Sequence, residues 1–154
     1  MFLSIREDNT NLFVANLDDG SVEQLTDLPG IVAYLAWSPD GRTIAFTIVR
    51  EREFLLSSHI AVVPVTGGEV TQLTNDAGLS HQAAWSPDST MIAYTHVPEG
   101  RLPDELSWIA VVPAAGGDRT LLTDNNWGVW NPAGPRRATG SRSSPRATGC
   151  SRSN

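Results

Sequence analysis

The stretch LAWSPDGRTIAFT, residues Leu35–Thr47, returns in recognisable form as AAWSPDSTMIAYT, residues Ala83–Thr95. Its tryptophan recurs after 48 residues, from Trp37 to Trp85. Three more landmarks follow in the same order at a step of 49 residues: IAVVP at 60–64 and 109–113, GG at 67–68 and 116–117, and LT at 73–74 and 122–123. A weaker copy, LFVANLDDGSVEQLT at 12–26, lies 48 residues before 60–74. A fixed period of this size indicates a repeat architecture.

Each repeat divides into four short segments that we expect to be strands: 32–37, 43–49, 59–65 and 69–74, then 80–85, 91–97, 108–114 and 118–123. Each Trp is followed by Ser-Pro-Asp, in which Pro39 and Asp40 suit the centre of a tight turn. Gly41 accepts a positive φ there, whereas its counterpart Ser89 does so less readily. The i, i+3, i+4 spacing of an amphipathic helix is not seen in the sequence.

Four-stranded units that recur every 40–50 residues are typical of the blades of a β-propeller. A single blade cannot cover both of its own faces, so each blade depends on its neighbours. We therefore expect an all-β protein, an incomplete β-propeller of four-stranded antiparallel blades. It has two full blades and a partial blade at each end.

The repeat predicts how the chain is divided. FLSIRED at 2–8 matches FTIVRER at 46–52, so the chain opens at the second strand of a blade. The expected units are a partial blade with strands two to four, two full blades, the start of a further blade and a tail. Their boundaries are 1–31, 32–79, 80–128, 129–133 and 134–154.

The tail, residues 134–154, replaces the next Trp-Ser-Pro motif and is predicted to be disordered because it is rich in Gly, Ser and Pro. Codons allowed for Ala133–Arg137 spell Trp-Ser-Pro in the adjacent reading frame. We therefore hypothesise that the tail is a frameshift product, and the alternative is a natural basic tail. The nucleotide sequence decides, since codons that cannot encode Trp-Ser-Pro in that frame exclude the frameshift.

Charge and composition exclude several functional classes. All 17 acidic residues and six arginines lie in residues 1–133, which carry a net charge of −11, and this opposes nucleic-acid binding. No apolar run is long enough to insert into a membrane. No signal peptide is visible. The single cysteine, Cys150, excludes an internal disulfide framework and a multi-cysteine metal site.

Over residues 2–133, AWSPDGRTIAFT followed by IAVVPVTGGEVTQLT resembles the repeat of TolB-type, WD-repeat-like β-propellers. The resemblance implies a non-enzymatic binding or scaffold module that contacts envelope proteins in the periplasm. Similar blades occur in the non-catalytic propellers of prolyl-oligopeptidase-family serine peptidases. The alternative is therefore the propeller portion of such a peptidase, without its hydrolase domain.

Loop length separates the two ends of the blades. Tight turns such as SPDG, DDG and TGG occupy one end, which we call the tight-turn end. The other end, called the long-loop face, carries longer and more varied segments, at 50–58, 75–80, 98–107 and 124–130. Binding residues concentrate in loops on a rigid scaffold. We therefore expect a protein partner at the long-loop face, with Asp76, His81, Asp124, Asn126, Trp127 and Trp130 as candidate contacts.

Each candidate also has a simpler interpretation. His81 could face the channel mouth, but a lone histidine is more often packed or on the surface. Trp127 and Trp130 suit either an interface or a core. Asp76, Asp124 and Asn126 offer oxygen atoms, but the spaced-acid pattern of a calcium loop is missing.

Catalytic motifs are also missing. Ser80, in GLSHQ, lacks the following glycine of a nucleophile elbow. The sequence shows neither paired carboxylates nor a phosphate-binding glycine loop. We therefore predict no catalytic residue, no cofactor and no metal site.

Overall fold

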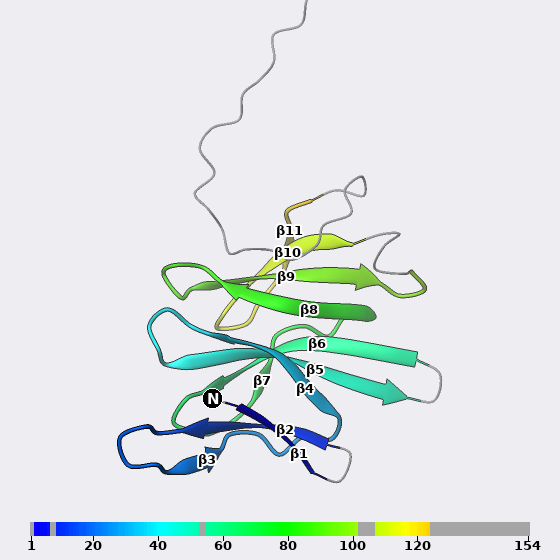
Figure 1. The fold of residues 1–154 in the computed structure, drawn as a ribbon. Coiled ribbons are helices and arrows are strands. Elements are labelled where there is room, and N and C mark those ends of the chain that lie inside the picture. The colour runs from blue at the N-terminus through cyan, green and yellow to red at the C-terminus, as the bar shows by residue number, and fades with distance from the viewer. Residues whose placement is uncertain (1, 7–8, 53–54, 102–106, 124–154) are drawn as a thin grey trace, which may run out of the picture.

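The computed structural model describes residues 2–6, 9–52, 55–101 and 107–123, and these contain strands and turns but no helix (Figure 1). The strands are β1 (Phe2–Arg6), β2 (Asn9–Ala15), β3 (Val22–Gln24), β4 (Ile31–Trp37), β5 (Thr43–Arg52), β6 (Leu55–Pro64), β7 (Thr71–Gln72), β8 (Gly78–Trp85), β9 (Met91–Pro98), β10 (Trp108–Pro113) and β11 (Thr120–Leu121).

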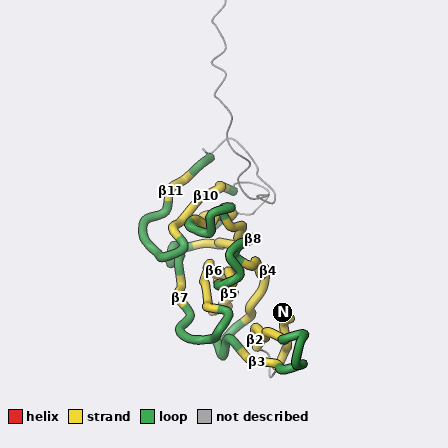
Figure 2. The backbone as a smooth tube through the Cα atoms, turned by 90° about the vertical axis from the view of Figure 1, so that its left-hand side faces the viewer, coloured by secondary structure: helices red, strands yellow, loops and turns green. Residues whose placement is uncertain are grey.

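The strands form three antiparallel groups stacked one above another: β1–β3, β4–β7 and β8–β11 (Figures 1 and 2). Neighbouring groups share a single parallel residue pair, Thr10 with Ile31 and Ser58 with Leu79. These pairs are equivalent, since both members move by 48 residues. In the strand order β1 and β11 are at opposite ends, so the sheet is not closed. The predicted all-β, incomplete propeller is confirmed.

Side chains from neighbouring groups form two core clusters. Alternate residues of β5 and β6 enter different clusters because successive side chains of a strand point to opposite faces. The first cluster contains Leu12, Leu25, Val32, Ile44, Phe46, Ile48, Ala61 and Val63. The second contains Ala45, Ile60, Val62, Trp85, Ile92, Tyr94, Ala110 and Val112. The middle group is therefore covered on one face by the group before it and on the other by the group after it.

Hydrogen bonds explain why Ser-Pro-Asp is repeated. The Ser38 hydroxyl donates to Asp40 Oδ1 at 2.6 Å and accepts from the Thr43 N–H at 3.0 Å, which closes the turn into β5. Ser86, Asp88 and Met91 repeat the arrangement before β9. The position after the Asp is left-handed in both copies, with φ of 71° at Gly41 and 61° at Ser89. Ser89 therefore occupies a conformation that favours glycine.

The repeated Thr of the LT landmark fixes the end of the outer segment. In each group its hydroxyl accepts an N–H from the neighbouring strand at 2.9 Å: Thr26 from Leu12, Thr74 from Ile60, and Thr123 from Ile109. The Leu73 N–H also donates to the Ile60 carbonyl at 2.8 Å. These bonds hold the segment after β7 and β11 has ended, so the outer strands are two residues long, shorter than the segments predicted.

The segment 50–58 differs from the expected long loop. β5 continues to Arg52 and β6 begins at Leu55, so most of the segment is a hairpin in which Arg50 pairs with Ser57. The polar letters of REREFLLSS suggested a loop, but the ladder of β5 and β6 extends to include them.

The two repeated tryptophans have different surroundings. The Trp85 indole N–H donates to the Ala36 carbonyl of the preceding group at 3.0 Å, and its side chain is 9% exposed. Trp37 is 39% exposed. The sequence predicts structural packing for both residues. They differ because Trp85 faces β4, whereas the described strands before β4, β1–β3, include no inner strand opposite Trp37.

Replacing each tryptophan in turn tests this difference. Trp85→Phe should lower the free energy of unfolding by about 1–2 kcal/mol, because it removes a buried hydrogen bond and leaves unfilled volume. Trp37→Phe, the matched control, should change it by less than about 0.5 kcal/mol, as expected for an exposed residue. Urea unfolding followed by circular dichroism measures both. Equal losses in the two variants would contradict the stacking described here.

Candidate functional site

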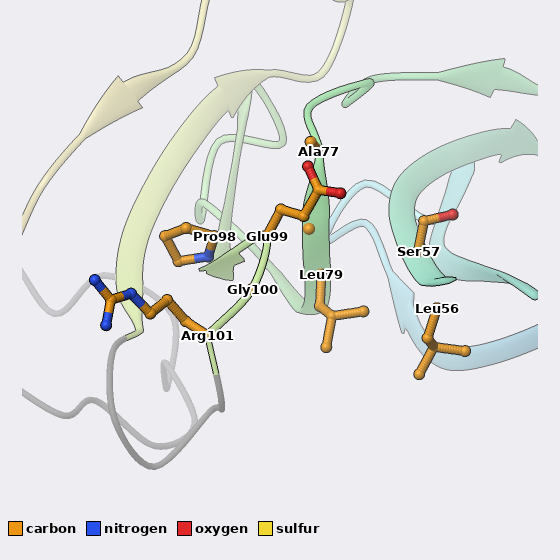
Figure 3. Close-up of a pocket in the computed structure, with 9 residues that line it drawn as sticks. Leu56, Ser57, Ala77, Leu79, Pro98, Glu99, Gly100 and Arg101 are labelled. Atoms are coloured by element: carbon orange, nitrogen blue, oxygen red, sulfur yellow. The ribbon is translucent and has the colours of Figure 1, made fainter. Parts of the chain in front are cut away.

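A cavity of about 360 Å³ opens on the long-loop face (Figure 3). Three segments meet there: the tip region of the β5–β6 hairpin, the connection into β8, and the turn after β9. The lining residues are Leu56, Ser57, Ala77, Gly78, Leu79, Pro98, Glu99, Gly100 and Arg101. The structure therefore brings together three of the four segments predicted to form this face, while the fourth, 124–130, lies outside the described residues.

The cavity combines apolar walls with charges at its edge. Leu56 and Leu79 point to the same side in Figure 3, and Leu56 is 55% exposed. The exposed Glu99 and Arg101 extend in different directions from the turn after β9. An apolar centre with a polar edge is the usual arrangement of a protein interface.

Gly78 shapes one wall because a side chain cannot fit there. Its φ is 113°, and an added Cβ would lie 2.2 Å from the Val97 carbonyl oxygen. Gly30, at the start of β4, has the same close approach to the Val49 carbonyl, at 2.5 Å. The repeated glycine lets each inner strand lie tightly against its neighbour, which brings residues 77–79 close to Pro98.

Asp76 has an ion-pair partner. Its Oδ2 is 2.7 Å from Nη1 of Arg119, and both side chains are about one-third exposed. At the previous junction the equivalent positions are Leu28 and Val70, which pack against the first core cluster. The ion pair therefore takes the place of apolar side chains between two groups. Because it is partly exposed, we expect it to contribute up to about 1 kcal/mol to stability.

His81 contacts the neighbouring group. Its ring centroid is 6.1 Å from that of Tyr34, which lies at a bulge in β4. Burial lowers the pKa of His81, so the imidazole is neutral at pH 7. Tyr34 has a φ of 52° and its equivalent, Gln82, has a φ of 59°. The bulge is thus repeated, and it places an aromatic ring between two inner strands.

The structure also reveals a serine–histidine pair that the sequence did not indicate. Ser80 Oγ and His96 Nδ1 are 3.1 Å apart on paired positions of β8 and β9. Their exposed fractions are 1% and 2%, and the His96 ring lies against Trp108 at 5.8 Å. Burial, then Arg119, lowers the pKa of His96. A pair this buried cannot meet a substrate, and we interpret it as structural.

The other candidates are not placed. Asp124, Asn126, Trp127 and Trp130 lie outside the described residues. Within residues 2–6, 9–52, 55–101 and 107–123, there is no group of three His, Cys, Asp or Glu residues that could hold a metal ion. The same part of the chain has no helix long and apolar enough to cross a membrane. Sequence reasoning missed the cavity residues Leu56, Leu79 and Arg101, whose only signal was their position in the longer segments.

The buried histidines predict a pH dependence. His59, His81 and His96 all have lowered pKa values, with burial as the largest cause. As pH falls through 6.5, the unfolded chain takes up protons that the folded chain does not, so stability should fall between about pH 6.5 and 5. His96→Asn should reduce this slope in thermal melts. Asp88→Asn is the control, because the hydroxyls of Ser86 and then Thr90 lower the pKa of Asp88 to about 2. A flat wild-type profile would contradict the assignment.

Comparison with known proteins supports the fold. A TolB structure from Agrobacterium tumefaciens matches with a TM-score of 0.63, 22% identity and 79% of this chain covered. TolB from Acinetobacter baumannii matches with a TM-score of 0.60, 24% identity and 79% coverage. The tricorn protease matches with a TM-score of 0.56 and 17% identity over 67% of this chain and 11% of its own. No protein-family model and no curated protein sequence matches.

The chain spans 43% of the Agrobacterium protein and 29% of the Acinetobacter protein. At these identities the likeness concerns the fold. It agrees with the repeated tryptophan, the Ser-Pro-Asp turns and the stacked four-stranded groups. This chain therefore has the fold of part of a TolB-type β-propeller.

Proposed function

We propose that this chain is a non-enzymatic binding module, part of a TolB-like β-propeller that holds a protein partner at its long-loop face. The observation that supports this proposal is the meeting of three variable segments around one cavity. Its volume, about 360 Å³, suits an inserted side chain or short peptide segment. Leu56 and Leu79 offer apolar contact, and Glu99 and Arg101 offer charged groups at the edge.

The chemistry of the described residues favours binding over catalysis. Ser80 and His96 are the closest approach to a nucleophile and a base, and both are almost fully buried. Asp76 is committed to Arg119. The proposal therefore needs no cofactor and no metal. The acidic charge of residues 1–133 favours a protein over a nucleic acid as the partner.

A second candidate function is the propeller portion of a peptidase. The tricorn protease match favours it, because a protease also contains this fold. The two candidates differ in the coding sequence downstream. A Gly-x-Ser-x-Gly motif in the frame that restores Trp-Ser-Pro would favour the peptidase. Its absence over a full domain length would favour the binding module. The TolB likeness supports a periplasmic location, which cell fractionation of the tagged product tests.

A pair of leucine variants tests the proposed face. Peptides selected on the full chain from a random display library should bind at the cavity. Leu56→Asp should weaken them at least about tenfold, because it places a charge in the apolar contact. Leu17→Asp is the matched control: Leu17 is 94% exposed and lies in the turn after β2, at the tight-turn end, so binding should be unchanged.

Titration calorimetry gives the affinities. Peptides that lose affinity with Leu17→Asp and keep it with Leu56→Asp would place binding at the tight-turn end and refute the proposed face. A library that yields no binder to the long-loop face would refute it as well.

A further inference from the structure

The groups β1–β3 and β4–β7 meet as the groups β4–β7 and β8–β11 do, except that one strand is lacking. The parallel pair Thr10–Ile31 is equivalent to Ser58–Leu79. The pair Phe2–Phe13 is likewise equivalent to Phe46–Ala61, so β1 corresponds to part of β5. β5 has β4 on its other side, whereas among the described strands β1 pairs with β2 alone. The vacant place is therefore one inner strand wide.

The side chains that face this place are exposed. On β4, Ile31 is 49% exposed, Tyr34 56% and Trp37 39%. Their equivalents on β8 are Leu79, Gln82 and Trp85, and each of these is buried or half-buried. The difference has a direct cause, since β8 has β4 opposite it.

The hydrogen bonding points the same way. Trp85 donates its indole N–H to the carbonyl of Ala36 in the inner strand of the preceding group. Among the described residues, the Trp37 indole N–H has no such acceptor. The free edge of β1 also offers backbone N–H and C=O groups, which readily pair with an added strand.

We propose that a single extended peptide strand with the inner-strand pattern of this repeat docks between β1 and β4. By equivalence with β4 and β5, it runs antiparallel to β1 and places three successive residues opposite Ile5, Ser4 and Leu3. Its carbonyl equivalent to that of Ala36 accepts the Trp37 indole N–H. Strand addition of this kind draws its affinity from main-chain hydrogen bonds and its selectivity from side-chain contacts.

This inference does not rest on the proposed function, because it concerns the inner strands and not the long-loop face. The pattern also defines the chemistry of the occupant. The inner strands carry alanine where Trp85 approaches, at Ala36, and again at Ala84. A small side chain at this position leaves the carbonyl accessible to the indole. A bulky residue there should be excluded.

The probe for the test is a fluorescein-labelled peptide with the sequence of residues 78–86, GLSHQAAWS. Its fluorescence anisotropy should saturate on titration with the full chain. Two versions are N-methylated at the neighbouring positions that correspond to Ser80 and His81. Since alternate residues of an antiparallel strand bond to the partner, one version should lose about tenfold in affinity and the other less than about threefold.

Protein variants complete the test. Trp37→Phe should weaken the peptide about three- to tenfold, the effect of one hydrogen bond. Leu122→Ala, at an exposed residue beyond β11, is the control and should leave affinity unchanged. Thermal melts establish that each variant is folded. Size-exclusion chromatography shows whether a second copy already supplies the strand.

The outcomes separate cleanly. A dimer that the peptide splits and Trp37→Phe weakens supports the proposal, with the second copy as the source of the strand. A cooperatively melting monomer with no saturable binding up to about 1 mM overturns it. Binding that neither N-methylation nor Trp37→Phe affects overturns it as well, and so does a dimer that resists both.

Discussion

The hydrogen bond from the Trp85 indole to the Ala36 carbonyl marks the constraint on which this structure depends, the covering of each blade by the next. Consecutive groups share a single parallel residue pair, so backbone pairing contributes little between them. Their cohesion comes from apolar faces in two clusters, from this bond, and from the ion pair of Asp76 with Arg119. A repeat protein is stabilised in this way by interfaces between neighbours.

The repeat made the fold predictable because each landmark has one physical task. Ser-Pro-Asp closes the turn into the second strand, and the threonine of LT receives an N–H from the third. What the repeat could not show is where equivalence fails. Trp37 and Trp85 have the same local sequence, but their exposed fractions are 39% and 9% because only Trp85 has an inner strand opposite it in the described structure.

The candidate site was predicted less well than the fold. Loop length indicated a face, and three of its segments do meet at the cavity. The individual residues followed different rules. Asp76 pairs with a residue 43 positions away and His81 stacks on Tyr34, contacts that depend on how the blades are stacked. The cavity is instead lined by leucine, proline and glycine, residue types that carry no sequence signature of binding.

Hydrogen exchange of the tryptophan indoles tests the stacking most directly. Five tryptophans give five indole signals in the spectrum of the ¹⁵N-labelled full chain, and the Phe variants identify those of residues 37 and 85. Slow exchange at Trp85 with nearly unprotected exchange at Trp37 is the result that follows from the structure. Equal exchange at both would mean that Trp85 has no partner across the groups, and the account of neighbouring blades would be wrong.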